Sequence, residues 1–124
     1  MGTYLYIAAG GALGSIGRYW MAGAIDGRLN AAFPYGTLAI NVTGSLVIGF
    51  FLTLATERLS LDPLWRLFFA TGFLGAYTTF SSYTYEAAQL LRDGAYALAF
   101  LYLFGSVLAG MVGVFAGIIL AEQL

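Results

Sequence analysis

The sequence predicts an all-α membrane protein in which a single domain, residues 1–124, consists of four transmembrane helices. Hydrophobic residues make up 60% of the chain and charged residues only 9%. Soluble domains, by comparison, carry about 25% charged residues. The charges gather in short gaps between long apolar runs, and a spanning helix needs roughly 20 apolar residues. The runs predict spans at residues 3–22, 35–56, 64–91 and 96–121, which leaves no room for a soluble appendage.

Several classes of chemistry are disfavoured by composition. The chain has no cysteine and no histidine, so it lacks thiolate chemistry, disulfides and the commonest metal ligand and proton shuttle. A net charge of −1 and the absence of lysine argue against binding to nucleic acid. We therefore expect no enzyme and no nucleic-acid partner. Since the first residues lack the basic start of a signal peptide, we expect an uncleaved first helix.

The first span carries small residues on one face. Gly10 and Gly14 lie one helical turn apart, a spacing that allows close contact with another helix. Arg18 lies near the end of this span and precedes Tyr19 and Trp20. From the residues alone two interpretations of Arg18 stay open. It either reaches the lipid headgroups beside an aromatic belt or serves a function inside the protein.

A polar connection is expected at residues 26–34, before the second span. Thr37, Asn41 and Ser45 then recur at steps of four, which predicts a polar stripe along one face of the second helix. An asparagine near the middle of a span is costly unless it finds hydrogen-bond partners. The residues alone favour a role for Asn41 in holding helices together.

The third span contains a segment, residues 72–86, that is a poor helix by local rules. Gly75 is flexible, two consecutive β-branched threonines begin at Thr78, and hydroxyl groups are frequent. Irregular backbone survives at membrane depth only where it is buried in protein or lines a cavity. We therefore predict a broken helix beside a conduction or binding site. The rings of Phe80 and Tyr83 belong either to this site or to an ordinary lipid-facing or core surface.

The fourth span follows a tight turn at residues 92–94. Tyr102, Ser106 and Gly110 recur at steps of four and form a weak polar stripe that we expect to face protein. Two further glycines, Gly113 and Gly117, share one face and predict a packing surface for another helix.

The arginines set no single orientation in the membrane. Arg58 and Arg66 fall on the side of the termini, whereas Arg28 and Arg92 fall on the other, joined by Arg18 if it faces there. Orientation follows the excess of Lys and Arg in short loops. The near balance predicts insertion in both directions and an antiparallel homodimer. A four-helix subunit also has too little interior to shelter a polar break, which favours pairing.

Three segments together resemble the signatures of the Fluc/CrcB fluoride channel family. They are residues 10–19 (GGALGSIGRY), 36–44 (GTLAINVTG) and 72–83 (GFLGAYTTFSSY), in the order that the family has them. The resemblance covers essentially the whole chain. It implies a fluoride-selective channel that exports fluoride passively and reduces fluoride toxicity. It also implies a multi-pass protein of a bacterial inner membrane and an antiparallel dimer with two pores.

The resemblance further implies the site residues. A central structural sodium ion would be held by the backbone carbonyls of Gly75 and Thr78 from both subunits. The anion pathway would be lined by Asn41, Phe80 and Tyr83, with hydroxyls from Thr37, Ser82, Tyr102 and Ser106. Arg18 resembles the signature arginine of the first helix, and Glu86 would lie toward a vestibule. No protein partner other than a second copy is implied.

Two positions depart from the family pattern. Tyr83 stands where the family usually has phenylalanine, and its added hydroxyl either hydrogen-bonds an anion or occupies the path. Gly110 stands where a hydroxyl often continues the polar track, which is therefore expected to be shorter here.

Two alternatives are kept beside the channel. A small multidrug-resistance-type, proton-coupled exporter needs a carboxylate inside the membrane, typically in the first helix. The first span has none, and Glu86 comes late in the third. The other alternative is a non-transporting membrane assembly protein whose glycine faces only bind a partner. Fluoride flux from reconstituted protein separates the three.

Overall fold

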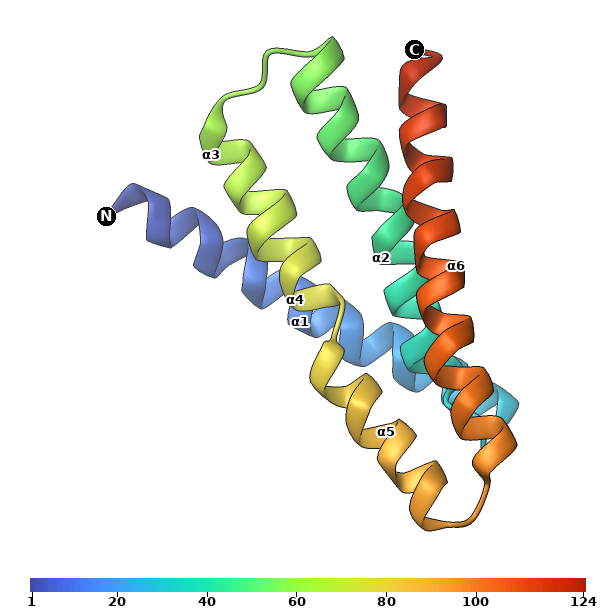
Figure 1. Ribbon diagram of the computed structural model, residues 1–124. Helices are drawn as coiled ribbons and strands as arrows, with labels where there is room; N and C mark the ends of the chain where they lie inside the picture. The colour runs from blue at the N-terminus through green and yellow to red at the C-terminus, as the bar shows by residue number, and fades with distance from the viewer.

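The computed structural model describes residues 1–124 and contains only helices, connected by short links (Figure 1). The elements are α1 (Gly2–Leu29), α2 (Tyr35–Thr53), η1 (Leu54–Arg58), α3 (Pro63–Arg66), η2 (Leu67–Leu74), α4 (Gly75–Tyr77), α5 (Phe80–Arg92) and α6 (Tyr96–Glu122). The segments η1 and η2 have wider, π-helical turns. Since α2 runs directly into η1, and α3 into η2 and α4, the chain forms five continuous helical runs.

Two of these runs are long and apolar enough to cross a membrane. They are Tyr35–Arg58 and Tyr96–Glu122, with mean hydropathies of 2.0 and 2.3. The helix α1 has sufficient length, but glycines, tyrosines and Arg18 dilute its apolar character. The third predicted span is divided after Tyr77 into two shorter runs. Length and composition in the structure therefore support two spans, and the other two remain predictions.

The first helix is longer than the sequence suggested, because it continues into the expected polar connection as far as Leu29. Asp26 lies inside α1, and its carboxylate accepts a hydrogen bond from the Gly36 N–H at 2.8 Å. This bond satisfies one of the free N–H groups at the start of α2. The helix ends at Leu29, followed by Asn30 in the left-handed conformation with φ of 45°. Asp26 thus joins the end of one helix to the beginning of the next.

Glycines allow the helix backbones to approach closely. A Cβ atom at Gly117 of α6 would overlap the carbonyl oxygen of Leu46 in α2. A Cβ atom at Gly14 of α1 would likewise overlap the carbonyl oxygen of Phe73 in η2. The predicted small-residue faces of the first and fourth spans therefore lie at helix–helix contacts. They place α2 beside α6, and α1 across the run that leads to the break (Figure 1).

The buried core of the single chain is small and lies between α5 and α6. Its contiguous cluster consists of Tyr83, Ala87, Leu90, Ala99 and Tyr102. Many large apolar side chains of α6, including Phe104, Leu108 and Val112, are exposed instead. An apolar surface this extensive is unusual for a soluble monomer. It is the surface expected of a chain that contacts lipid or a second copy.

Candidate functional site at the helix break

The site is built around an interruption between α4 and α5. Thr78 has φ of −87° and ψ of 158°, and Thr79 has φ of −148° and ψ of 122°, so both residues are extended. The new helix α5 begins at Phe80, capped by the Thr79 hydroxyl, which accepts a hydrogen bond from the Ser82 N–H at 3.1 Å. The interruption lies inside the segment, residues 72–86, where irregular backbone was predicted.

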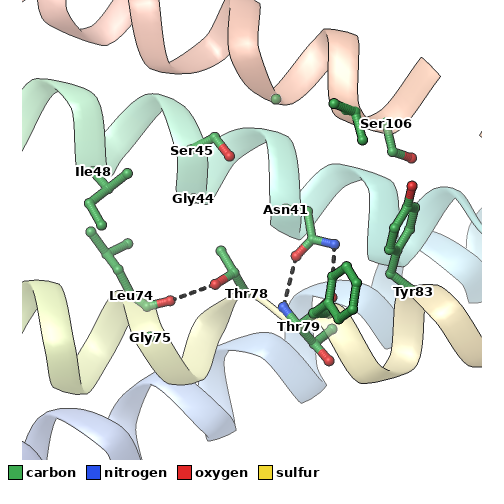
Figure 2. A pocket seen from close by; sticks show the side chains of 13 residues that line it. Asn41, Gly44, Ser45, Ile48, Leu74, Gly75, Thr78, Thr79, Tyr83 and Ser106 are labelled. Carbon is green, nitrogen blue, oxygen red and sulfur yellow. Dashed lines mark hydrogen bonds between the residues drawn. The ribbon is translucent and has the colours of Figure 1, made fainter. Parts of the chain in front are cut away.

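The Asn41 side chain holds this interruption from the neighbouring helix α2. Its Oδ1 accepts a hydrogen bond from the Thr79 N–H at 2.8 Å, and its Nδ2 donates to the Thr79 carbonyl at 3.0 Å (Figure 2). One amide thus pairs with both backbone polar groups of Thr79. Asn41 therefore has the partners that its position in the second span requires. Its Nδ2 retains one further hydrogen for another acceptor.

The bonds that Asn41 and the Thr79 hydroxyl make at the interruption leave two backbone carbonyls without their helical donors. In a continuous α-helix the Thr79 N–H would bond the Gly75 carbonyl, and the Ser82 N–H would bond the Thr78 carbonyl. Here the first N–H goes to Asn41 and the second to the Thr79 hydroxyl. No cluster of acidic side chains is present that would hold a metal ion. The freed oxygens of Gly75 and Thr78 are of the kind that hard cations prefer, so they fit the implied sodium ion.

Arg18 reaches the break from α1. Its Nε donates a hydrogen bond to the Ala76 carbonyl in α4 at 2.9 Å, and the side chain is half-buried. This bond satisfies another carbonyl at the end of the helical run, and a cation there complements the helix dipole. Of the two interpretations of Arg18, the contact with α4 favours a role inside the protein.

A cavity of about 340 Å³ opens beside the break, between α2, α5 and α6 (Figure 2). Its lining includes Asn41 and Ser45 of α2, Gly75, Thr78 and Thr79 at the break, Phe80 and Tyr83 of α5, and Ser106 and Gly110 of α6. Four of the predicted anion-pathway residues and both predicted sodium residues therefore meet at one place. The ring of Phe80 is 76% exposed in the single chain.

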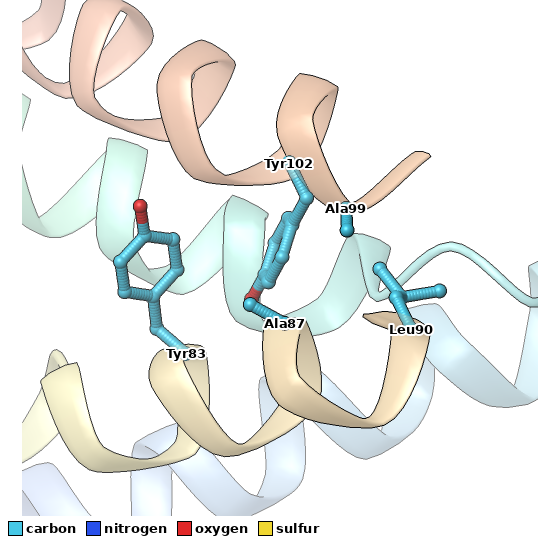
Figure 3. Close-up of a cluster of buried hydrophobic side chains, with 5 residues drawn as sticks. All are labelled: Tyr83, Ala87, Leu90, Ala99 and Tyr102. Carbon is cyan, nitrogen blue, oxygen red and sulfur yellow. The ribbon is translucent and has the colours of Figure 1, made fainter. Parts of the chain in front are cut away.

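Three of the remaining predicted residues, Thr37, Glu86 and Tyr102, lie outside the lining of this cavity. The Thr37 hydroxyl donates a hydrogen bond to the Glu86 carboxylate at 2.6 Å. Tyr102 is completely buried, and its ring lies 5.1 Å from that of Tyr83 (Figure 3). Glu86 also lines a cavity of about 400 Å³ beside the α1–α2 connection and the end of α5, which includes Asp26.

Ser82 lines neither cavity, and the same holds for Thr37, Tyr102 and Arg18. Only the backbone N–H of Ser82 contributes to the break. Conversely, Thr79 was not among the residues expected to serve the site. A threonine directly before a helix is a common N-cap, which is the signal that identifies it.

Comparison with known proteins decides the family. Residues 5–118 match the family model described as CrcB-like protein, Camphor Resistance (CrcB). The chain belongs to the CrcB family. It is similar to the Fluoride-specific ion channel FluC of Sulfurihydrogenibium sp. (strain YO3AOP1), with 47% identity over 100% of both chains. The FluC protein of Solibacter usitatus (strain Ellin6076) is 45% identical over 97% of this chain and 98% of its own length.

Membership of the CrcB family confirms the resemblance found in the three sequence motifs. The relatives are named as ion channels, so the expectation of a membrane channel family, and not an enzyme, is also confirmed.

In this CrcB chain the Tyr83 hydroxyl, whose role the sequence left open, has a hydrogen-bond partner within the chain. The Tyr83 hydroxyl donates a hydrogen bond to the Leu103 carbonyl of α6 at 2.5 Å. The hydroxyls of Tyr102 and Ser106, by contrast, are buried and have no hydrogen-bond partner. The neutral donors that are not already used within the chain therefore include the hydroxyls of Ser106 and Tyr102 and the second N–H of the Asn41 amide.

Proposed function

We propose that this protein is a fluoride-selective channel that lets fluoride leave the cell passively and so reduces fluoride toxicity. The observation that carries the proposal is the meeting of Asn41, Phe80, Tyr83 and Ser106 around one cavity beside the broken helix. The FluC names of full-length relatives at 44 to 47% identity support the choice of ion. The exporter and the assembly protein have no comparable support.

The lining suits a small anion that is strongly hydrated. Conduction requires sites that replace the water of the ion without holding it too tightly. The Ser106 hydroxyl and the second Asn41 N–H are neutral donors, and the exposed ring of Phe80 has a positive edge. The guanidinium of Arg18 is engaged with the Ala76 carbonyl, and no arginine lines the cavity. Such a lining favours transit over trapping.

The working unit is an antiparallel homodimer in the inner membrane, with four spans in each subunit and two anion pores. Backbone polar groups cannot face lipid without partners. In the single chain Gly75 and Phe80, on either side of the break, are exposed. A second copy that covers this face would bury the break and enclose the open cavity. The balanced arginines are consistent with two opposite orientations.

A central sodium ion is part of the proposal. The carbonyls of Gly75 and Thr78 would hold it, and because one subunit offers only two such oxygens, the second subunit would complete the set. The support is the diversion of the Thr79 and Ser82 N–H groups away from these carbonyls. When bound, the ion would supply a positive charge that balances the carbonyl dipoles of two facing breaks.

The test is passive fluoride efflux from liposomes. Purified protein is reconstituted into vesicles loaded with potassium fluoride, valinomycin removes the membrane potential, and a fluoride electrode records release. We expect rapid release with no proton gradient, and tags at the C-terminus accessible from both sides. Absence of release, or release that requires a pH gradient, would refute the channel. A tag found on one side only would refute the antiparallel dimer.

A further inference from the structure

Tyr83 separates the two groups of residues that the proposed anion route would connect. Its ring lines the cavity that holds Asn41 and Ser106. The same ring also packs against that of Tyr102, with the ring centroids 5.1 Å apart (Figure 3). The Thr37–Glu86 pair likewise lies outside the cavity lining. Tyr83 is only 8% exposed, so little free space surrounds it. An ion that moves from the cavity toward Tyr102 therefore has to pass this side chain.

The hydroxyl of Tyr83 is not available to an anion in this arrangement. A phenol has one hydrogen to donate, and here it goes to the Leu103 carbonyl at 2.5 Å. The phenol oxygen can then offer only lone pairs, which repel an anion. Because Tyr83 belongs to α5 and Leu103 to α6, the bond also ties together the two helices that enclose the passage.

We propose that the Tyr83 hydroxyl is a latch that narrows the passage between the cavity and Tyr102 and sets the rate of fluoride transit, without itself binding the ion. The inference rests on the proposed function. Fluoride passes when the bond from Tyr83 to the Leu103 carbonyl opens and the ring moves aside. Ser106 and Tyr102, whose hydroxyls have no partners, then supply donors on either side of the ring.

The decisive variant is Tyr83→Phe, which keeps the ring and removes the latch. We expect fluoride efflux from liposomes to rise about two- to tenfold, the range to which the loss of one net hydrogen bond corresponds. The matched control is Tyr85→Phe on the same helix. Its ring is 65% exposed, and its hydroxyl only accepts a bond from Gln89, so efflux should equal that of the original protein.

A second variant carries 4-fluorophenylalanine at position 83, which fills the space of the hydroxyl but donates no hydrogen bond. We expect it to conduct faster as well. Size-exclusion chromatography and the thermal unfolding midpoint are measured for every variant before reconstitution. A lower midpoint with unchanged flux would assign the bond to stability alone and overturn the latch.

Slower efflux in Tyr83→Phe would also overturn the proposal, because it would make the hydroxyl a ligand for the ion. The failure of the channel assignment would look different. In that case the original protein itself would release no fluoride. If only the latch is wrong, the original protein releases fluoride and neither variant at position 83 releases it faster.

Discussion

The Asn41 amide performs two tasks that substitutions can separate. Its oxygen holds the Thr79 N–H and its nitrogen holds the Thr79 carbonyl, while the same side chain lines the cavity. Asn41→Asp keeps an oxygen for the Thr79 N–H but adds a negative charge to the proposed anion route. Asn41→Ala removes both hydrogen bonds and adds no charge.

The charge in Asn41→Asp should stop conduction. Two unit charges about 4 Å apart interact by about 4 kcal/mol at an effective dielectric constant of about 20. At about 1.4 kcal/mol for each factor of ten, this barrier slows fluoride about a thousandfold. Efflux should then match that of empty liposomes in the electrode assay. Efflux within tenfold of the original protein would refute the electrostatic argument.

The two variants should differ in their response to sodium. In Asn41→Ala the Thr79 N–H is free to return to the Gly75 carbonyl, which removes a proposed ligand of the ion. An unsatisfied buried donor costs about 1–3 kcal/mol if it does not find that partner. We expect sodium to raise the thermal unfolding midpoint of the original protein and of Asn41→Asp, but not of Asn41→Ala.

The measurement compares unfolding in sodium chloride with unfolding in N-methylglucamine chloride, both in detergent. Ser45→Ala is the matched control, since Ser45 lies one turn further along α2 and its hydroxyl makes no bond to the break. It should retain the sodium response. If Asn41→Ala responds to sodium as Asn41→Asp does, the link between the amide and the Gly75 carbonyl is wrong.

Two further predictions concern the exposed ring and the glycine contacts. Phe80→Ile should slow fluoride efflux at least tenfold, because isoleucine has no ring edge to offer the anion. The unfolding midpoint should change little, because Phe80, which is 76% exposed in the single chain, adds little to the core of the subunit and isoleucine keeps the position apolar. Equal efflux would remove the ring from the route. Gly14→Ala should destabilise the protein by about 1–3 kcal/mol, because its Cβ overlaps the Phe73 backbone. Gly23→Ala, whose Cβ meets nothing within 4 Å, is the control, and equal unfolding midpoints for both would refute the packing argument.

Local sequence was sufficient for features that depend on neighbours along the chain. Long apolar runs and the arginine-bearing gaps located the helices of the second and fourth spans, which the structure has at Tyr35–Arg58 and Tyr96–Glu122. Two consecutive threonines after Gly75 indicated the interruption that lies at Thr78 and Thr79. Such features follow from backbone preference and hydrophobicity, which each segment carries by itself.

The end of the first helix could not be located in this way. The sequence predicts Asp26 to lie in a polar connection. Its carboxylate instead accepts a hydrogen bond from the N–H of Gly36, ten residues further along the chain. A helix that gains such a partner continues where a polar residue would otherwise end it.

The chemistry of the site was decided by tertiary structure. Asn41 and Thr79 are 38 residues apart, and only the packing of α2 against the break lets this asparagine take the Thr79 N–H and so free the Gly75 carbonyl. The sequence alone left the Tyr83 hydroxyl as either an anion ligand or an obstruction. The Leu103 carbonyl on another helix takes its single hydrogen. Sequence thus determined which polar groups lie within the helices, whereas packing determined which donors and acceptors are already paired, because a hydrogen bond depends on distances of a few ångströms in space.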